Sequence, residues 1–93
     1  MITILARFKV KPGADADFEA ATRDVFTAVR KEPGCVALHA LRDADGFVFV
    51  ERYRDADALA AHRANEAMKT LGPRLMAAVD GRPAIETYEE VDW

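Results

Sequence analysis

Hydrophobic and polar side chains alternate from Ile2 to Val10, which is the period of a β-strand with one buried face. Lys11-Pro12-Gly13 ends this strand. From Phe18 onward the apolar residues recur at helical spacing, and Pro33-Gly34 stops the helix. The first third of the chain is therefore expected to be a strand followed by an amphipathic helix.

The middle of the chain predicts a β-hairpin. Residues 35–42 and 47–54 have strand character, and Asp43-Ala44-Asp45-Gly46 is a suitable loop between them. If Arg42 lies opposite Phe47, both faces of the hairpin are apolar. One face then carries Val36, Leu38, Ala40, Phe47, Phe49 and Tyr53, and the other carries Cys35, Ala37, Leu41, Val48 and Val50. A hairpin without a polar face needs a cover on each side.

A second helix is expected from Leu59 to Leu71, with Asp55 or Asp57 as its N-cap. Gly72-Pro73 breaks it before a further short helix, and residues 84–92 form a last alternating strand. The order is β-α-β-β-α-β, which predicts an α+β, ferredoxin-like fold with a four-stranded antiparallel sheet. Residues 1–93 are expected to form a single domain.

The second face of this sheet has no cover in the predicted chain, because both helices pack on the first face. A second copy, packed sheet against sheet about a two-fold axis, would cover it. The pattern therefore predicts a homodimer with sheet-to-sheet packing.

Composition narrows the range of partners without naming one. The 93 residues are 51% hydrophobic and 31% charged, with a formal net charge of −3. This balance gives no electrostatic reason to expect nucleic acid or an anionic membrane as a partner. Cys35 is the only cysteine, which excludes an intrachain disulfide and fits a reducing cytoplasm. We therefore expect a cytoplasmic protein with neither a signal peptide nor a membrane span.

Four segments carry a family signature: Lys9–Gly13, Glu32–Cys35, Phe47–Tyr53 and Ala58–His62. With the order of elements, they resemble the antibiotic biosynthesis monooxygenase domain family of the dimeric α+β barrel superfamily, over nearly the whole chain. The resemblance implies a homodimeric barrel with a pocket between sheet and helices in each subunit. It also implies a cofactor-independent monooxygenase acting on a small phenolic, quinol or polyketide-like aromatic molecule.

Two departures from the family pattern limit this functional interpretation. Many members have Trp where this chain has Tyr53, and many have a second His where this chain has Ala67. Haem-degrading relatives use an Asn on the first strand, and Ile2–Val10 contains none, so haem degradation is not expected. No flavin, haem or nicotinamide motif is present, and no cofactor is expected. An isomerase or other proton-transfer enzyme, or a non-catalytic dimeric small-molecule-binding domain, stay open as alternatives.

His62 is the first catalytic candidate, because an imidazole titrates near neutral pH and can act as a general base. The family resemblance implies a pocket position for it. A helical wheel favours the surface, since His62 falls roughly opposite the side formed by Ala60, Ala64, Ala67 and Leu71. Glu66, four residues on, would then be a helix-surface partner. No third side chain has metal-ligand spacing, so no metal is expected.

Two tyrosines and one carboxylate complete the polar candidates. Tyr53, as a second catalytic residue, and Tyr88 could donate a hydrogen bond to a phenolic substrate. Glu51 shares the aromatic face of the hairpin, where its pKa would be raised unless Arg42 or Arg7 pairs with it. Glu51 is therefore either a substrate-binding acid or base, or half of an interface ion pair.

Three further residues are candidates for contact with the substrate. His39 faces the side of the hairpin that holds Leu41 and Val48, where it could line a pocket or an interface, or lie in a core. Phe49 and Met68 would supply apolar walls.

Overall fold

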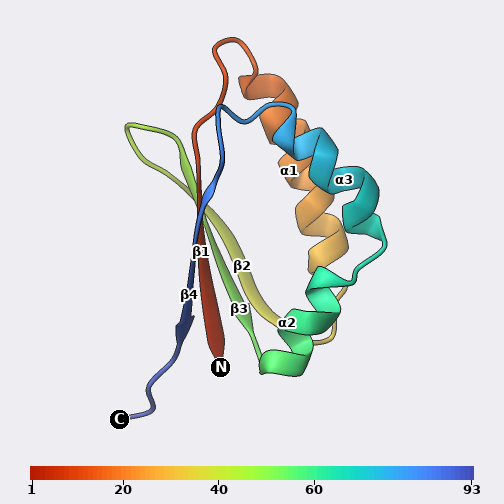
Figure 1. The fold of residues 1–93 in the computed structure, drawn as a ribbon, viewed down its shortest axis with the longest axis vertical. Helices are drawn as coiled ribbons and strands as arrows, with labels where there is room; N and C mark the ends of the chain where they lie inside the picture. Colours follow the sequence, from red (N-terminus) through yellow and green to blue (C-terminus); the bar gives the residue numbers. More distant parts are fainter.

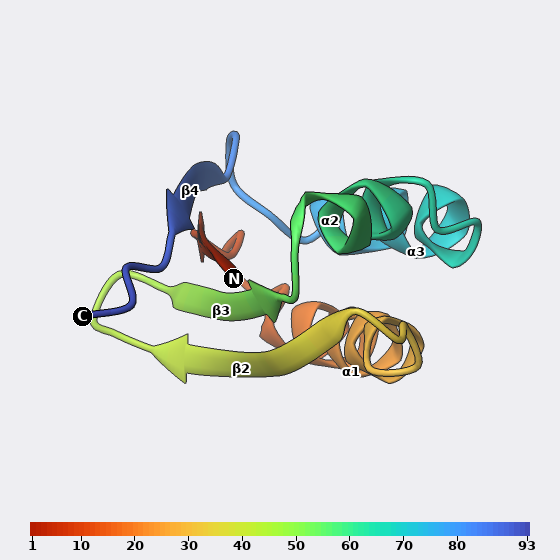
Figure 2. The same cartoon turned by 90° about the horizontal axis from the view of Figure 1, so that it is seen from below.

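Seven elements follow one another along residues 1–93, all of which the computed structural model describes. They are β1 (Ile2–Phe8), α1 (Asp15–Val29), β2 (Cys35–Arg42), β3 (Phe47–Tyr53), α2 (Ala56–Arg63), α3 (Ala67–Met76) and β4 (Ala84–Glu89). The strands form one four-stranded antiparallel sheet in the order β2-β3-β1-β4. All the helices lie on the same face of this sheet (Figures 1 and 2). The ferredoxin-like α+β fold is confirmed.

The hairpin has the predicted register, with Leu38 opposite Glu51 and His39 opposite Val50. A β-bulge between Cys35 and Ala37 shifts the start of β2, so that Cys35 lies opposite Tyr53. The expectation that Cys35 belongs to the other face is therefore wrong, because a bulge adds one residue to one strand and reverses the alternation beyond it.

The core between helices and sheet is built on phenylalanine. Phe8, Phe18, Phe26 and Phe49 are all buried. The ring of Phe26 meets that of Phe49 edge-on at a centroid distance of 5.0 Å, and Phe8 packs on Phe49 at 4.5 Å. Offset and edge-on pairs of this kind are favourable beyond the area they bury. Together they fix α1 against β1 and β3.

The second helical region departs from its prediction. The helix ends at Arg63, and α3 begins at Ala67 and runs through Pro73. The side-chain oxygen of Asn65 accepts a hydrogen bond from the Ala67 N–H at 3.0 Å, which serves the exposed amide at the start of α3. The predicted break at Gly72-Pro73 is wrong, because Asn65 starts a new helix whose interior accommodates the proline.

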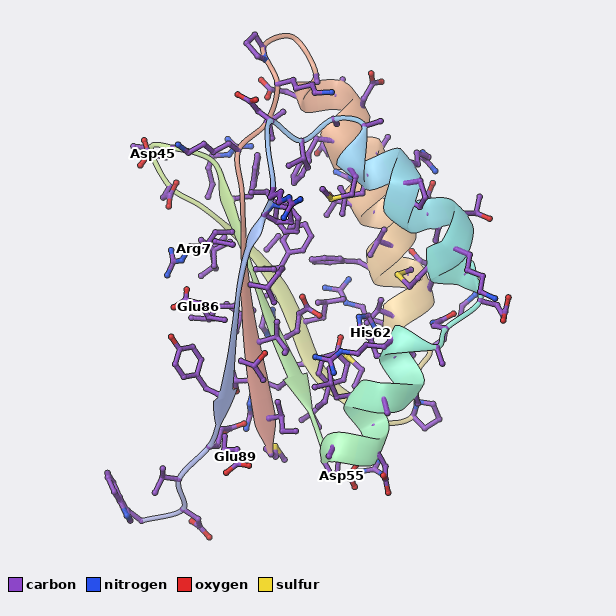
Figure 3. The ribbon with its side chains drawn as sticks, viewed as in Figure 1. Arg7, Asp45, Asp55, His62, Glu86 and Glu89 are labelled. Atoms are coloured by element: carbon purple, nitrogen blue, oxygen red, sulfur yellow. The ribbon has the colours of Figure 1, made fainter.

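The opposite face of the sheet has no helix over it. We call this the open face; β1 and β4 present Arg7 and Glu86 on it, paired at 3.0 Å, and both point away from the helices (Figure 3). Leu41 and Tyr88 keep 53% and 49% of their surface exposed. The uncovered face agrees with the sequence pattern, and the homodimer that would cover it stays a prediction. None of the helices has the length and apolar character needed to cross a membrane.

Candidate active site

Five polar side chains meet between α2, the turn that follows α1, and the inner face of β3. We call them the polar cluster: Glu32, Glu51, Tyr53, His62 and Asn65. They come from segments that are distant in sequence, and His62 lies between α2 and the sheet (Figure 3). The surface position that the helical wheel favoured is therefore wrong. The wheel assumed one continuous helix, but α2 ends at Arg63. The only buried residue of α2 is Leu59, so Leu59 marks the side of the helix that faces the sheet.

Glu32 holds one side of the imidazole. Nδ1 of His62 lies 3.0 Å from Oε2 and 3.1 Å from Oε1 of Glu32. The Asn65 amide donates a further hydrogen bond to Glu32 Oε2 at 2.7 Å. The side chains of His62 and Glu32 are only 19% and 12% exposed, so solvent screens this contact weakly.

Glu51 and Tyr53 form the other side of the polar cluster. The Tyr53 hydroxyl donates to Glu51 Oε1 at 2.7 Å, and this oxygen lies 3.9 Å from Nε2 of His62. The rings of Tyr53 and His62 pack with centroids 5.0 Å apart. Burial raises the pKa of Glu51, although the Tyr53 hydrogen bond and His62 oppose the shift. Burial, followed by the nearby Glu51 charge, also raises the pKa of Tyr53, which keeps the phenol protonated.

Local sequence explains why α2 delivers His62 to this place. The Asp55 side chain accepts from the Ala58 N–H at 2.8 Å and caps the helix, as predicted. Leu59, one turn before His62, is buried with Ile4 and Tyr53. Gly34 lets the turn after α1 come very close to α2, because a Cβ on it would lie 2.2 Å from the Ala58 Cβ.

Cys35 lies beside the polar cluster but has the properties of a packing residue. Burial raises the pKa of its thiol, and the charges of Glu32 and Glu51 raise it further. A raised pKa removes the thiolate that nucleophilic chemistry requires.

The structure brings together three of the predicted site residues, His62, Tyr53 and Glu51. It does not bring the others to them. His39 and Tyr88 lie on the open face, where the Tyr88 hydroxyl donates to Glu86 at 2.6 Å.

Phe49 belongs to the phenylalanine core, and half-buried Met68 packs against it. The expected partners are also different. Arg7 pairs with Glu86 instead of Glu51, and Glu66 pairs with Lys69 instead of His62. Arg42 lies over the Phe47 ring at 5.2 Å, so neither arginine neutralises Glu51.

Sequence reasoning missed Glu32 and Asn65. Glu32 opens the Glu32–Cys35 segment that carries the family resemblance, which was the available signal for its importance. Nothing in the local pattern connects it with a histidine 30 positions further on. Asn65 was hidden by the assumption of a continuous helix.

A broad hollow on the molecule lies apart from the polar cluster. It has a volume of about 1040 Å³ and is formed mainly by α1 and the loop end of the β2–β3 hairpin, with Phe18, Phe26 and Phe47 among its walls. It shares no residue with the polar cluster. The chain also has no group of three His, Cys, Asp or Glu side chains arranged to hold a metal ion.

Comparison with known families agrees with this architecture. The family model described as antibiotic biosynthesis monooxygenase matches residues 1–72. The chain belongs to this family. Among curated proteins, Rv0793 of Mycobacterium tuberculosis, which carries the provisional name of a monooxygenase, is 36% identical over 64 residues. That match covers 67% of this chain and 63% of the length of Rv0793.

Solved structures of the antibiotic biosynthesis monooxygenase family share the fold closely. A protein from Caulobacter crescentus, described as a candidate member of the family, superimposes with a TM-score of 0.91 at 30% identity, covering 98% of this chain and 90% of its own. SnoaB, a cofactor-independent oxygenase from Streptomyces nogalater, superimposes with a TM-score of 0.86 over 99% of this chain and 94% of its own. At 23% identity, SnoaB supports the fold alone.

Proposed function

We propose that this family member is a cofactor-independent monooxygenase acting on a small, electron-rich phenol or quinol, with His62 as its general base. The observation that carries the proposal is the position of His62 between two carboxylates, Glu32 and Glu51, on the inner side of the sheet. Removal of a phenolic proton leaves positive charge on the imidazole. Two carboxylates beside a half-buried ring stabilise that charge when it develops.

The substrate itself supplies the electrons. Its deprotonated form passes one electron to O₂, and the substrate radical and superoxide then combine to form a C–O bond. The resulting hydroperoxide loses water, so that a hydroquinone and O₂ become a hydroxyquinone and H₂O. All four electrons that reduce O₂ come from the organic substrate, and the proton taken by His62 leaves with the water.

Tyr53 acts through Glu51 in this scheme, instead of touching the substrate. Its side chain is fully buried and its hydroxyl is already committed to the Glu51 carboxylate. It therefore holds Glu51 beside Nε2 of His62. The substrate reaches the imidazole through the 19% of the His62 side chain that remains exposed.

The functional unit is proposed to be a homodimer formed through the open face. Apolar residues of β1, β2 and β3 lie on this face without a cover, including Leu5, Leu41, Val48 and Val50. Burying such a patch is favourable, and a two-fold axis matches it with a copy of itself.

The test is O₂ uptake in the presence of a small hydroquinone such as 1,4-dihydroxynaphthalene, with the uncatalysed rate subtracted. The wild-type protein is expected to accelerate uptake, and His62→Ala to lose at least 100-fold of that acceleration, as expected for a general base. Arg63→Ala is the matched control, because Arg63 is exposed and adjacent to His62 on α2. Equal uptake by the wild type and His62→Ala would contradict the proposal.

A proton-transfer enzyme is the second candidate, because the polar cluster contains a base and no group specific for oxygen. Such an enzyme would exchange substrate C–H hydrogen with deuterium from solvent, in a His62-dependent way and without O₂. The same panel of compounds under argon therefore separates the two functions.

A further inference from the structure

We infer that Glu32 is a positioning residue that fixes which nitrogen of His62 carries the proton. The inference rests on the proposed role of His62 as a base and adds a residue to that site. It starts from the contact of Nδ1 with both oxygens of one carboxylate, at 3.0 and 3.1 Å.

A neutral imidazole has one N–H and one lone pair, and their positions depend on the surroundings of the ring. If the lone pair were on Nδ1, it would face two negative oxygens of Glu32 with no proton between them. That arrangement is repulsive in a place where Glu32 is 12% exposed. The proton therefore belongs on Nδ1, and the N–H donates to Glu32.

The consequence is that Nε2 carries the free lone pair. Nε2 is turned toward the sheet, 3.9 Å from Glu51 Oε1, which is too far for a hydrogen bond. The groups around the ring are Glu32 from the turn after α1, Glu51 and Tyr53 from β3, and Asn65 from the segment after α2. None of them donates a hydrogen bond to Nε2, so this nitrogen remains available to accept a proton.

Asn65 keeps Glu32 in place for this task. Its amide nitrogen donates to Glu32 Oε2 at 2.7 Å, while its oxygen accepts from the Ala67 N–H at 3.0 Å. Both ends of the side chain are used, which orients the amide and ties the carboxylate to the start of α3. The hydrogen bond from Asn65 therefore restrains the Glu32 carboxylate in its contact with the His62 imidazole.

The inference can be tested on the resting protein by nitrogen-15 NMR of the imidazole rings, at a pH where they are neutral. The chain has two histidines, and exposed His39 on the open face is an internal reference. In the wild type, His62 is expected to show a protonated Nδ1 and a non-protonated Nε2. In Glu32→Gln the pattern is expected to move toward a mixture of the two forms, while His39 does not change.

A second variant tests the inference without changing Glu32, in case Glu32→Gln does not fold. Asn65→Asp keeps the oxygen that serves Ala67 but replaces the donor to Glu32 with another carboxylate. It is expected to disturb the signals of His62 without unfolding α3. A merely structural role for Glu32 would change the unfolding free energy and leave the proton on the same nitrogen.

Activity gives an independent measurement. Glu32→Gln is expected to lower kcat for O₂ uptake by roughly 10- to 100-fold with little change in KM, as is usual when the partner of a functional histidine is removed. The inference is wrong if His62 carries its proton on Nε2 in the wild type, or if Glu32→Gln changes neither the NMR pattern nor kcat. If the NMR result holds but His62→Ala retains full O₂ uptake, the proposed function fails and the proton assignment stands.

Discussion

At the scale of single residues, Glu51 is the carboxyl group with the least favourable surroundings for its charge. It lies on the inner face of β3, its side chain is 13% exposed, and its nearest hydrogen-bond donor is the neutral Tyr53 hydroxyl. Burial raises its pKa, so the fold favours the protonated form more than the unfolded chain does. Glu51 therefore makes the stability of the protein depend on pH.

The direction of this dependence follows from the raised pKa. Stability contributed by protonated Glu51 is fully present below the ordinary glutamate pKa of about 4.3 and is lost as the pH rises through the raised native pKa. Glu51→Gln keeps an acceptor for Tyr53 and carries no charge. We expect this variant to be more stable than the wild type at neutral pH, and the difference to vanish near pH 4.

Urea unfolding at the two pH values measures this difference. An opposite result, with the wild type the more stable protein at neutral pH, would mean that attraction to His62 outweighs the burial of the carboxylate.

Some of the polar cluster could be predicted from the sequence at this scale. His62, Tyr53 and Glu51 have side chains suited to proton transfer, and the alternation along residues 47–54 placed Tyr53 and Glu51 on one face. The partners of His62 could not be predicted, because Glu32 reaches it only after the turn following α1 has packed against α2. Contacts between distant segments depend on tertiary packing and leave no local pattern.

At the scale of elements, the close approach of α2 to the turn after α1 depends on Gly34. Gly34→Ala would place a methyl group 2.2 Å from the Ala58 Cβ, so one of the two segments must move. We expect a loss of about 1–3 kcal/mol in unfolding free energy, the usual cost of overpacking. Denaturant unfolding provides the measurement.

Two further variants separate this clash from other effects of replacing a glycine. Gly34→Ala combined with Ala58→Gly removes the opposing methyl group and is expected to recover part of the loss, because the Cα of residue 58 still lies 3.1 Å from the added Cβ and a glycine within α2 costs up to about 1 kcal/mol. Gly72→Ala, with no heavy atom within 4 Å of the added Cβ, should cost nothing and can gain up to about 1 kcal/mol in helix propensity. If the losses of Gly34→Ala and Ala58→Gly measured separately simply add in the double variant, the clash is not the cause.

The helix after β3 shows where element-level prediction stops. Apolar spacing indicated helical structure from Leu59 to Leu71, but as one helix broken at Gly72-Pro73, whereas the break lies between Arg63 and Ala67. Asn65 instead provides a side-chain hydrogen bond that starts α3, and Pro73 is tolerated within it. Helix propensity alone cannot decide whether the chain breaks at Asn65 or at Pro73. The position of the break depends on how the two helical segments pack on the sheet.

At the scale of the whole molecule, the open face determines the proposed assembly. Val50 is half-buried in the centre of this face, between Leu5 of β1 and His39 of β2. Val50→Glu would place two unpaired charges in a two-fold interface, at a cost of about 3 kcal/mol or more. We expect sedimentation to show a dimer for the wild type and a monomer for this variant.

The matched control is Ala20→Glu, which adds the same charge at an exposed position of α1. Circular dichroism establishes that each variant is folded. A wild-type protein that sediments as a monomer at micromolar concentration would overturn the dimer.

Helix α2 makes few buried contacts with the rest of the molecule, and this has a consequence for hydrogen exchange. This helix has eight residues and a single buried side chain, Leu59, so the contact of His62 with Glu32 is one of the few that hold it to the rest of the molecule. Segments with few buried contacts open at a lower free energy than the global transition. Backbone amides of α2 should therefore exchange with deuterium sooner than those of β1 and β3, and His62→Ala should accelerate exchange in α2 but not in α1. Each opening of α2 would separate His62 from Glu32. The fraction of molecules in which α2 is packed on the sheet is therefore an upper limit on the fraction in which His62 can act as the proposed base.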